Sequence, residues 1–176
     1  MARLGIGDRI DNFEFLAPDN LRYPLLKEDD GRTILLWFMR YAGCTVCRVD
    51  LHELKERIGE FEAAGARVVV VLQSVPETAA EVEAPFEIVC DPEGALYRKY
   101  DILPAKSKLG ILSAALPGKL KKAKKLGLEH GAYEGDEQQL PALFVLGADG
   151  VVRYARYASN LTDLPDLDEM LRLVKA

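Results

Sequence analysis

The sequence feature that most constrains the fold is a strand–helix–strand pattern in the first half of the chain. The segments "TILLWFM" (33–39) and "ARVVVVLQ" (66–73) are apolar runs of strand length, which is typical of strands buried on both faces of a sheet. Between them, apolar residues recur every three to five positions from Val46 to Phe61, which predicts one amphipathic helix. The pattern predicts a βαβ unit and therefore an α/β protein.

The rest of the chain continues this alternation. We expect helices over 76–84, 95–102 and within 163–176, a strand over 86–90, and a hairpin of two strands over 142–157. The segment 104–138 is the least regular part and is expected to hold one or two helices, with the lysines of "KLKKAKKLG" on a solvated face. Because no linker or repeat divides the 176 residues, we expect a single domain over 1–176.

The composition excludes several classes of protein. The net charge of −5 argues against binding to nucleic acid, because a basic surface is needed to neutralise phosphates. The longest apolar runs are far shorter than the roughly 20 residues of a membrane-spanning helix. The N-terminal segment "MARLGIGDRID" lacks the apolar core of a secretory signal. We therefore expect a cytoplasmic protein that binds neither nucleic acid nor membranes.

Two cysteines stand three positions apart where the first strand gives way to the helix. Cys44 is expected just before the first helical turn and Cys47 within it, where unpaired N–H groups and the helix dipole favour negative charge. In such C-x-x-C corners the thiol pKa falls from about 8.5 to about 7 or lower, which produces a reactive thiolate at neutral pH. Arg40 and Arg48 flank the pair and either add positive charge to it or point to solvent. The corner is therefore a candidate redox site.

Two other interpretations of the C-x-x-C pair remain open. Both cysteines would be inert if they simply filled the core. A structural zinc site needs a tetrahedral set of ligands, and the chain adds only His52 and His130, so a metal site within one chain is not expected. A metal site shared between subunits is the remaining alternative. Cys90, at the end of a strand-like run, is expected to be a small buried residue rather than a third redox cysteine.

Several motifs together resemble the alkyl hydroperoxide reductase/thiol-specific antioxidant (AhpC/TSA) family, the peroxiredoxins and peroxiredoxin-like proteins of the thioredoxin-fold superfamily. They are the strand that enters the C-x-x-C corner, "GDRIDNFEF" (7–15), "FEIVCDPEGALYRKYDI" (86–102) and "LPALFVLGADGVVRYARY" (140–157). The resemblance covers most of the chain and is weakest over 104–138. It implies a thioredoxin-like fold, with a central mixed β-sheet flanked by helices, an N-terminal extension and a helical insertion before the last hairpin.

The chain departs from the peroxiredoxin pattern close to the cysteines. The family motif Pro-x-x-x-Thr/Ser-x-x-Cys ends in the cysteine that attacks peroxide, which corresponds to Cys47. Cys44 then takes the place of the hydroxyl residue, and Arg40 takes the place of the proline. Pro141 replaces the arginine that precedes the late strand, and it resembles the cis-proline of thioredoxins, whose loop packs against the cysteine pair and exposes backbone to a bound partner. The resemblance thus implies a thioredoxin-style dithiol site made of Cys44, Cys47, Pro141 and Arg40.

This resemblance implies a thiol-dependent antioxidant oxidoreductase that cycles Cys44 and Cys47 between dithiol and disulfide, with no bound cofactor. In a thioredoxin mode Cys44, expected to be the more exposed sulfur, attacks a protein disulfide and Cys47 resolves the mixed intermediate. In a peroxidase mode Cys47 attacks peroxide, forms a sulfenic acid and condenses with Cys44. Either mode needs a thioredoxin-type or low-molecular-weight thiol as reductant, and relatives of this kind often form a homodimer.

A protein of another class is the alternative to an enzyme. A redox-responsive thioredoxin-fold interaction module would use the same fold without significant turnover. Its partner surface would be the 104–138 segment. Slow oxidation of the cysteine pair together with tight binding to a cellular protein would favour this alternative.

Overall fold

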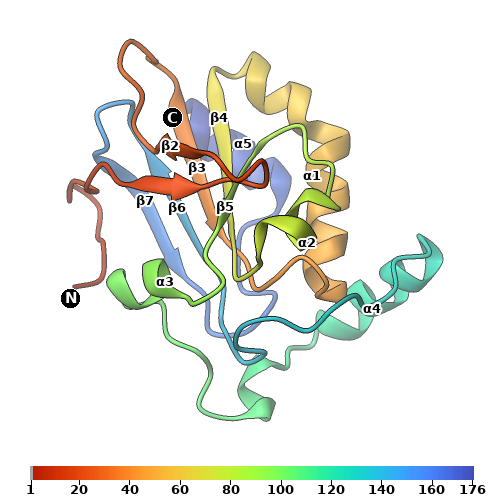
Figure 1. The fold of residues 1–176 in the computed structure, drawn as a ribbon. Helices are drawn as coiled ribbons and strands as arrows, with labels where there is room; N and C mark the ends of the chain where they lie inside the picture. Colours follow the sequence, from red (N-terminus) through yellow and green to blue (C-terminus); the bar gives the residue numbers. More distant parts are fainter. Residues whose placement is uncertain (1) are drawn as a thin grey trace.

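Seven strands form one mixed sheet in the computed structural model, which describes residues 2–176 (Figure 1). The strand order is β2-β1-β5-β4-β3-β6-β7, and β3, β4 and β5 run parallel to one another. The strands are β1 (Glu14–Leu16), β2 (Arg22–Pro24), β3 (Thr33–Phe38), β4 (Ala66–Leu72), β5 (Glu87–Cys90), β6 (Ala142–Leu146) and β7 (Val152–Tyr157). The helices are α1 (Thr45–Ala63), α2 (Pro76–Ala80), α3 (Ala95–Lys99), α4 (Leu116–Lys125) and α5 (Leu167–Lys175), with a 3₁₀ turn η1 (Lys108–Ile111).

The βαβ unit predicted from the apolar pattern is confirmed. β3 pairs in parallel with β4 along its whole length, and α1 makes the connection between them. On its other edge β3 pairs antiparallel with β6, so it lies in the middle of the sheet. Both faces of β3 and β4 lie in the core, which explains their continuous apolar sequences. The corner between β3 and α1 is therefore attached to the most deeply buried part of the molecule.

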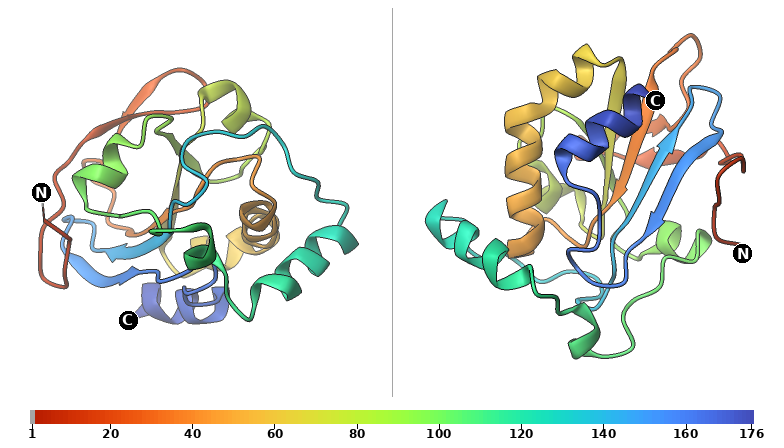
Figure 2. Two further views of the ribbon diagram at one scale, coloured as in Figure 1. Left: turned by 90° about the horizontal axis from the view of Figure 1, so that it is seen from below. Right: turned by 180° about the vertical axis from the view of Figure 1, so that it is seen from behind.

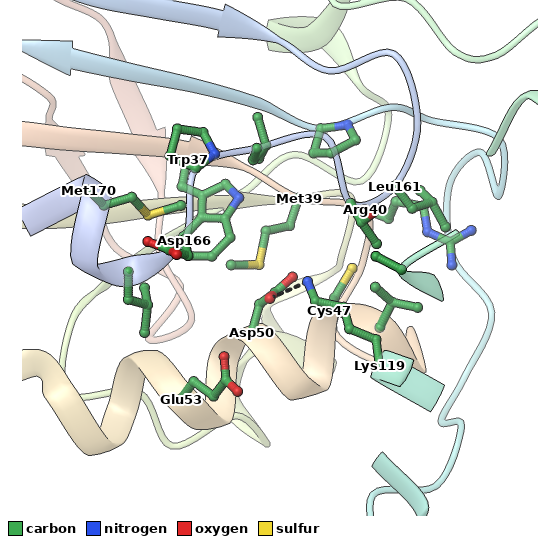
Figure 3. A pocket seen from close by; sticks show the side chains of 17 residues that line it. Trp37, Met39, Arg40, Cys47, Asp50, Glu53, Lys119, Leu161, Asp166 and Met170 are labelled. Atoms are coloured by element: carbon green, nitrogen blue, oxygen red, sulfur yellow. Dashed lines mark hydrogen bonds and ion pairs between the residues drawn. The ribbon is translucent and has the colours of Figure 1, made fainter. Parts of the chain in front are cut away.

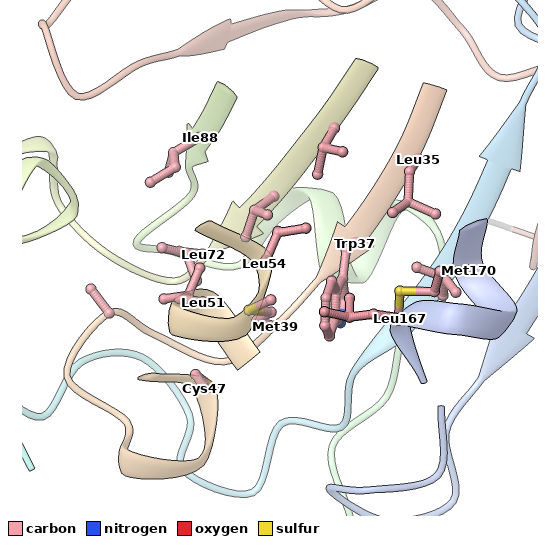
Figure 4. Packing of buried hydrophobic residues seen from close by; sticks show 14 of the residues in the cluster. Leu35, Trp37, Met39, Cys47, Leu51, Leu54, Leu72, Ile88, Leu167 and Met170 are labelled. Carbon is pink, nitrogen blue, oxygen red and sulfur yellow. The ribbon is translucent and has the colours of Figure 1, made fainter. Parts of the chain in front are cut away.

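Two hydrophobic clusters cover the two faces of the sheet. α1 and α5 lie against one face, as the rear view of Figure 2 shows. Their cluster includes Trp37, Leu54 and Met170, which pack together in Figure 4. The opposite face is covered by the N-terminal segment and α3, whose Phe15 and Tyr97 belong to the second cluster. The α/β class and the central mixed sheet flanked by helices are thus confirmed.

The N-terminal extension expected from the resemblance is present as a short hairpin. β1 and β2 pair antiparallel, and Leu16 of β1 joins the sheet opposite Cys90 of β5. The late hairpin is confirmed as β6 and β7, with the turn "GADG" between them. Within residues 2–176, no helix combines the length and apolar character that crossing a membrane requires.

Two short helices end earlier than the sequence predicts. α2 stops at Ala80 and α3 at Lys99. Glu83 and Asp101, which follow them, have positive φ values of 51° and 53°. A right-handed helix does not continue through a residue in the left-handed region, so each predicted helix is cut short there.

The irregular segment 104–138 holds η1 and α4, as expected, but its lysines are not all solvated. Lys119 and Lys122 of α4 form ion pairs with Asp50 and Glu53 of α1. The two pairs are three residues apart on both helices, so they join matching faces of α1 and α4. The prediction of a solvated lysine face is therefore wrong for Lys119, which is half-buried, because its partner lies 69 positions away in the sequence; Lys122 stays exposed while it pairs with Glu53.

Candidate active site

The two cysteines lie at the N-terminus of α1, as their spacing predicts. Cys44 is the N-cap residue, and its Sγ accepts a hydrogen bond from the backbone N–H of Cys47 at 3.3 Å. Cys47 lies in the first helical turn, and both residues are free thiols. A sulfur in the N-cap position receives the partial positive charge of unpaired helical N–H groups, which favours its thiolate form.

Arg40 binds the sulfur of Cys44 directly. Its side chain is only 8% exposed, and its Nη2 donates a hydrogen bond to Cys44 Sγ at 3.0 Å. Its Nη1 donates to the backbone carbonyl of Glu137, and its guanidinium lies 5.4 Å from the ring centroid of Tyr41. Arg48, the other flanking arginine, donates instead to the carbonyl of Glu129. Of the two arginines, Arg40 is therefore the one that adds positive charge to the pair.

The two thiols differ strongly in acidity. Burial by itself disfavours the Cys44 thiolate, but hydrogen bonds from the Cys47 thiol and backbone N–H and the charge of Arg40 outweigh it and lower the pKa of Cys44 to about 6. Burial raises the pKa of Cys47 well above its ordinary value, and the hydrogen bond it donates to Cys44 and the negative charge there raise it further. The pair therefore holds a single negative charge at neutral pH, with one proton shared between the two sulfurs.

The more acidic sulfur, that of Cys44, is the less accessible of the two. Cys44 has no exposed surface, whereas Cys47 is 6% exposed and lines a cavity of about 220 Å³ (Figure 3). The expectation that Cys44 is the more exposed sulfur is therefore wrong. The cavity lies between the start of α1, the α4 side of the insertion and the start of α5. Its lining also includes Trp37, Met39, Arg40, Asp50, Glu53, Lys119, Pro141, Leu161, Asp166 and Met170.

A segment of the insertion covers the neighbours of Cys44, and we call residues 129–137 the strap. The N–H of Gly131 donates to the carbonyl of Gly43 at 2.8 Å, and a Cβ on Gly43 would lie 2.3 Å from the carbonyl oxygen of Ala132. Arg40 and Arg48 hold the two ends of the strap through its carbonyls. Because the strap packs against Gly43, the residue next to Cys44, the Cys44 sulfur is closed to solvent.

Acidic and aromatic side chains fix the strap in place. The Glu134 carboxylate accepts hydrogen bonds from Ser74 Oγ at 2.7 Å, the Val75 N–H at 3.0 Å and Thr78 Oγ1 at 2.7 Å. His130 contacts Tyr41 through its Nε2, 3.0 Å from the tyrosine hydroxyl. The hydrogen bonds link the strap both to the loop after β4 and to the cysteine corner.

Pro141 lies where the resemblance expects it but not in the expected conformation. It directly precedes β6 and lines the cavity that Cys47 faces. Residues 2–176 contain no cis peptide bond, so the implied cis-proline is wrong. The trans form is the ordinary state of an X-Pro bond, and the carbonyl of Pro141 accepts the N–H of Ala158 at 3.0 Å. Pro141 therefore shares its position in the sequence with the thioredoxin proline, but not the cis conformation.

The other candidate residues lie apart from the cysteine pair. Cys90 is buried, as expected, and burial raises its pKa to about 12, which disfavours a reactive thiolate. His52 lines a second cavity beside α1, on whose lining neither redox cysteine appears. His130 belongs to the strap and stacks on Tyr133, with ring centroids 4.0 Å apart. Within the described residues 2–176, no three His, Cys, Asp or Glu side chains gather as metal ligands do.

The sequence interpretation missed Asp50 and Lys119 among the charged residues of the cavity. Asp50 follows Cys47 by three positions, so both lie on one helix face, and this spacing was the available signal. Lys119 arrives from the insertion and pairs with Asp50 at 2.5 Å. Nothing in the local sequence around Lys119 distinguishes it from the other lysines of α4.

Comparison with known proteins identifies the family. The family model for the AhpC/TSA family matches residues 6–155. PrxQ from Xylella fastidiosa, solved as a cysteine-to-serine mutant, is 16% identical with a TM-score of 0.69, over 98% of this chain and 96% of that one. Peroxidoxin BcpB from Mycobacterium tuberculosis is 14% identical with a TM-score of 0.67, over 97% of this chain and 96% of that one.

A peroxiredoxin-like protein from Aquifex aeolicus is 17% identical with a TM-score of 0.67, over 98% of this chain and 87% of that one. A search of curated protein sequences finds no significant match. The structural likenesses confirm the thioredoxin-like fold, and the family match covers most of the chain, including both cysteines of the corner. The chain therefore belongs to the AhpC/TSA family and is a thiol-dependent oxidoreductase of the peroxiredoxin type.

Proposed function

We propose that the protein reduces peroxides with Cys47 as the attacking sulfur and Cys44 as the resolving sulfur. The observation that carries this proposal is access: Cys47 lines the cavity, whereas Cys44 is closed to solvent beneath the strap. Of the two thiols, a small peroxide that enters the cavity meets Cys47 and not Cys44. The position of Cys47 in the family motif supports the same assignment.

Cys44 acts first as the base for Cys47. The Cys47 thiol donates its hydrogen bond to the Cys44 thiolate, so moving that proton to Cys44 leaves a Cys47 thiolate at the cavity. The thiolate attacks one peroxide oxygen: an S–O bond forms, the O–O bond breaks, and sulfur loses two electrons to the peroxide. The products are the Cys47 sulfenic acid and, after a proton reaches the leaving oxygen, an alcohol or water.

Cys44 then resolves the sulfenic acid. Its sulfur attacks Cys47 Sγ, an S–S bond forms, and the released hydroxide takes the Cys44 proton to give water. The C-x-x-C spacing at a helix start allows this disulfide to form within one chain. A thioredoxin-type protein or a low-molecular-weight thiol supplies two electrons to restore the dithiol. We place the whole cycle in a single domain of 1–176.

Arg40 supplies the positive charge for this cycle. The family's arginine position is occupied by Pro141, which has no charge, and the hydroxyl position is occupied by Cys44. Arg40 lies within hydrogen-bond distance of Cys44 Sγ and also lines the cavity. Its charge stabilises the shared negative charge whichever sulfur carries it, because it lowers the pKa of both thiols.

Single substitutions of the cysteines test the proposal by stopped-flow measurement of peroxide consumption. We expect Cys47→Ser to abolish the rapid reaction. Cys44→Ser should still give a sulfenic acid on Cys47 in one slow turnover but no internal disulfide. Cys90→Ala is the control, since Cys90 lies outside the pair, and it should keep the wild-type rate. Loss of the rapid reaction in Cys44→Ser with its retention in Cys47→Ser would contradict the assignment.

Disulfide reduction in the thioredoxin mode is the second candidate function. The lowered pKa of Cys44 favours it, because the thiolate is the nucleophile in disulfide exchange. The strap opposes it, because a protein disulfide needs direct access to that sulfur. Reduction of insulin disulfides at a rate comparable to peroxide reduction would favour this mode over the peroxidase.

A further inference from the structure

The leaving oxygen of the peroxide needs a proton donor in the cavity. When Cys47 attacks an alkyl hydroperoxide, the departing alkoxide is a strong base and leaves slowly unless it is protonated as the O–O bond breaks. Pro141, at the family's arginine position, offers neither a charge nor an N–H. Both Nη atoms of Arg40 bind Cys44 and the Glu137 carbonyl, and although its buried Nε has no partner, a guanidinium is too weak an acid to give up a proton. The donor must therefore come from another residue of the cavity wall.

Lys119 and Asp50 form an ion pair in that wall. Lys119 Nζ lies 2.5 Å from Asp50 Oδ1, and the two side chains are only 26% and 16% exposed. Asp50 follows Cys47 by three residues on α1, so its carboxylate projects from the same helix face as the sulfur. Figure 3 shows Asp50, Lys119 and Cys47 side by side at the cavity.

The remaining charged groups of the cavity are engaged elsewhere. Glu53 on α1 pairs with Lys122 of α4, and Asp166 before α5 caps that helix by accepting the Glu169 N–H at 2.9 Å. The other walls are apolar and include Trp37, Met39, Leu161 and Met170. An apolar wall strengthens the effect of the single ammonium group that faces the sulfur.

We propose that Lys119, positioned by Asp50, donates a proton to the oxygen that leaves when Cys47 attacks a peroxide. The inference rests on the proposed peroxidase function and adds a catalytic residue to it. The Nζ–H bond breaks as the O–O bond breaks, the leaving oxygen becomes a hydroxyl group, and the neutral amine recovers its proton from solvent. Asp50 is a positioning residue, since it holds the ammonium group and does not touch the peroxide.

The decisive experiment compares two peroxides that differ in their need for a proton. The alkoxide leaving group of tert-butyl hydroperoxide is a strong base, whereas the acetate leaving group of peracetic acid is a weak base that departs unprotonated. For Lys119→Met we expect the rate constant for tert-butyl hydroperoxide to fall about a hundredfold, the usual size of a general-acid contribution. The rate constant for peracetic acid should change little. Asp50→Asn should show the same selectivity with a smaller loss.

The comparison separates proton donation from other effects of the substitution. Loss of the Lys119 charge also disfavours the Cys47 thiolate, but that effect slows both peroxides by the same factor. The ratio of the two rate constants, measured on one preparation, does not depend on how much of the protein is folded. Lys122→Met is the matched control, because it removes the neighbouring α4–α1 ion pair to Glu53 while Lys122 itself does not line the cavity. It should keep the wild-type ratio.

Two results would overturn the inference. Equal losses for both peroxides in Lys119→Met would mean that the lysine acts only through charge or folding. The same selective loss in Lys122→Met would mean that any α4–α1 ion pair has this effect. If wild-type protein reacts slowly with both peroxides, it is the peroxidase function itself that fails, and this outcome is distinct from both.

Discussion

At the scale of single residues, the site depends on how one negative charge is shared by two buried sulfurs. Arg40 is the only cationic side chain with a hydrogen bond to either sulfur among the described residues. Cys44 receives this bond together with the N–H of the first helical turn, so the charge rests there in the resting enzyme. Cys47 lines the cavity, and burial raises its pKa so that it holds the proton. In the proposed cycle, one residue therefore stores the negative charge and the other residue uses it.

Substitution of Arg40 tests whether its guanidinium holds the negative charge on Cys44. For Arg40→Met we expect the pKa of Cys44 to rise from about 6 by roughly 1–3, because a guanidinium in contact is removed. The thiolate fraction at pH 7 then falls, and peroxide reduction slows at neutral pH and recovers as the pH rises. Thiolate absorbance in the ultraviolet, titrated against pH in a Cys90→Ala background, measures the change.

Arg48→Met is the matched control for Arg40→Met. Arg48 also flanks the cysteines, but its guanidinium donates to the Glu129 carbonyl and not to a sulfur. Its removal should leave the titration of the pair unchanged. A titration that shifts equally in both variants would mean that the general positive potential of the corner, and not the contact of Arg40 with sulfur, sets the acidity.

The residue scale also shows where sequence reasoning reaches its limit. The spacing of Cys44 and Cys47 correctly predicts that the two residues meet at the start of α1, because helix geometry alone brings such residues together. Their order of exposure was predicted wrongly, because the strap that closes Cys44 is distant in sequence. Pro141 was expected to be cis because its position resembles thioredoxin, although its own surroundings do not require that isomer. The sequence leaves Arg40 either beside the cysteines or pointing to solvent, and only its contact with Cys44 Sγ decides between the two.

At the scale of elements, the strap is the segment that packs against the corner beside Cys44. It approaches the corner so closely that only glycine fits at Gly43, and a Cβ on the facing Gly131 would lie a tight 3.0 Å from the Cα of Gly43. A Cβ on Gly43 would meet the backbone of Ala132, which no side-chain rotation can relieve. Backbone contact of this kind depends on the exact path of both segments. The strap should therefore lift from the corner when the contact is crowded.

Gly43→Ala tests the strap as an element. We expect the substitution to destabilise the fold by roughly 1–3 kcal/mol, as overpacking commonly does. We also expect Cys44 to become reactive toward a bulky maleimide and insulin reduction to increase. Mass spectrometry of the labelled cysteines, with chemical denaturation in parallel, measures both effects.

Gly59→Ala in α1 provides the control for Gly43→Ala. A Cβ on Gly59 would meet nothing within 4 Å, so the change should stabilise the helix by about 0.5–1 kcal/mol and leave Cys44 protected. Protection of Cys44 in Gly43→Ala as complete as in the wild type would show that the strap does not control access.

Elements of strong periodicity were predictable, and elements defined by distant contacts were not. β3, β4, α1 and the β6–β7 hairpin follow from apolar runs and turn residues that any local window contains. The insertion holds two helical segments, as expected, but its attachment to α1 through Lys119 and Lys122 depends on partners far away in the chain. The lengths of α2 and α3 were overestimated because a left-handed residue such as Glu83 carries no clear signal in sequence.

At the scale of the whole molecule, the C-terminal helix ties the cavity to the core. α5 lies beyond the residues 6–155 that match the family, yet Met170 and its neighbours are buried in the same cluster as Trp37. Met170 and Trp37 also line the cavity that Cys47 faces. The cavity wall and the hydrophobic core are therefore one structure, and we propose that the whole chain unfolds as one unit.

Met170→Ala tests this unity. Removal of a side chain that is 1% exposed should destabilise the protein by about 2–5 kcal/mol. Trp37 is the single tryptophan, so its fluorescence reports on the cluster beneath α5, while far-ultraviolet circular dichroism reports on all helices. If the chain is one domain, both signals should show the same urea midpoint, lower than that of the wild type.

Arg172→Ala, on the exposed side of α5, is the control and should change the free energy of unfolding by less than about 0.5 kcal/mol. Separate midpoints for the two signals would show that α5 unfolds on its own, in which case the cavity would lose a wall before the sheet unfolds.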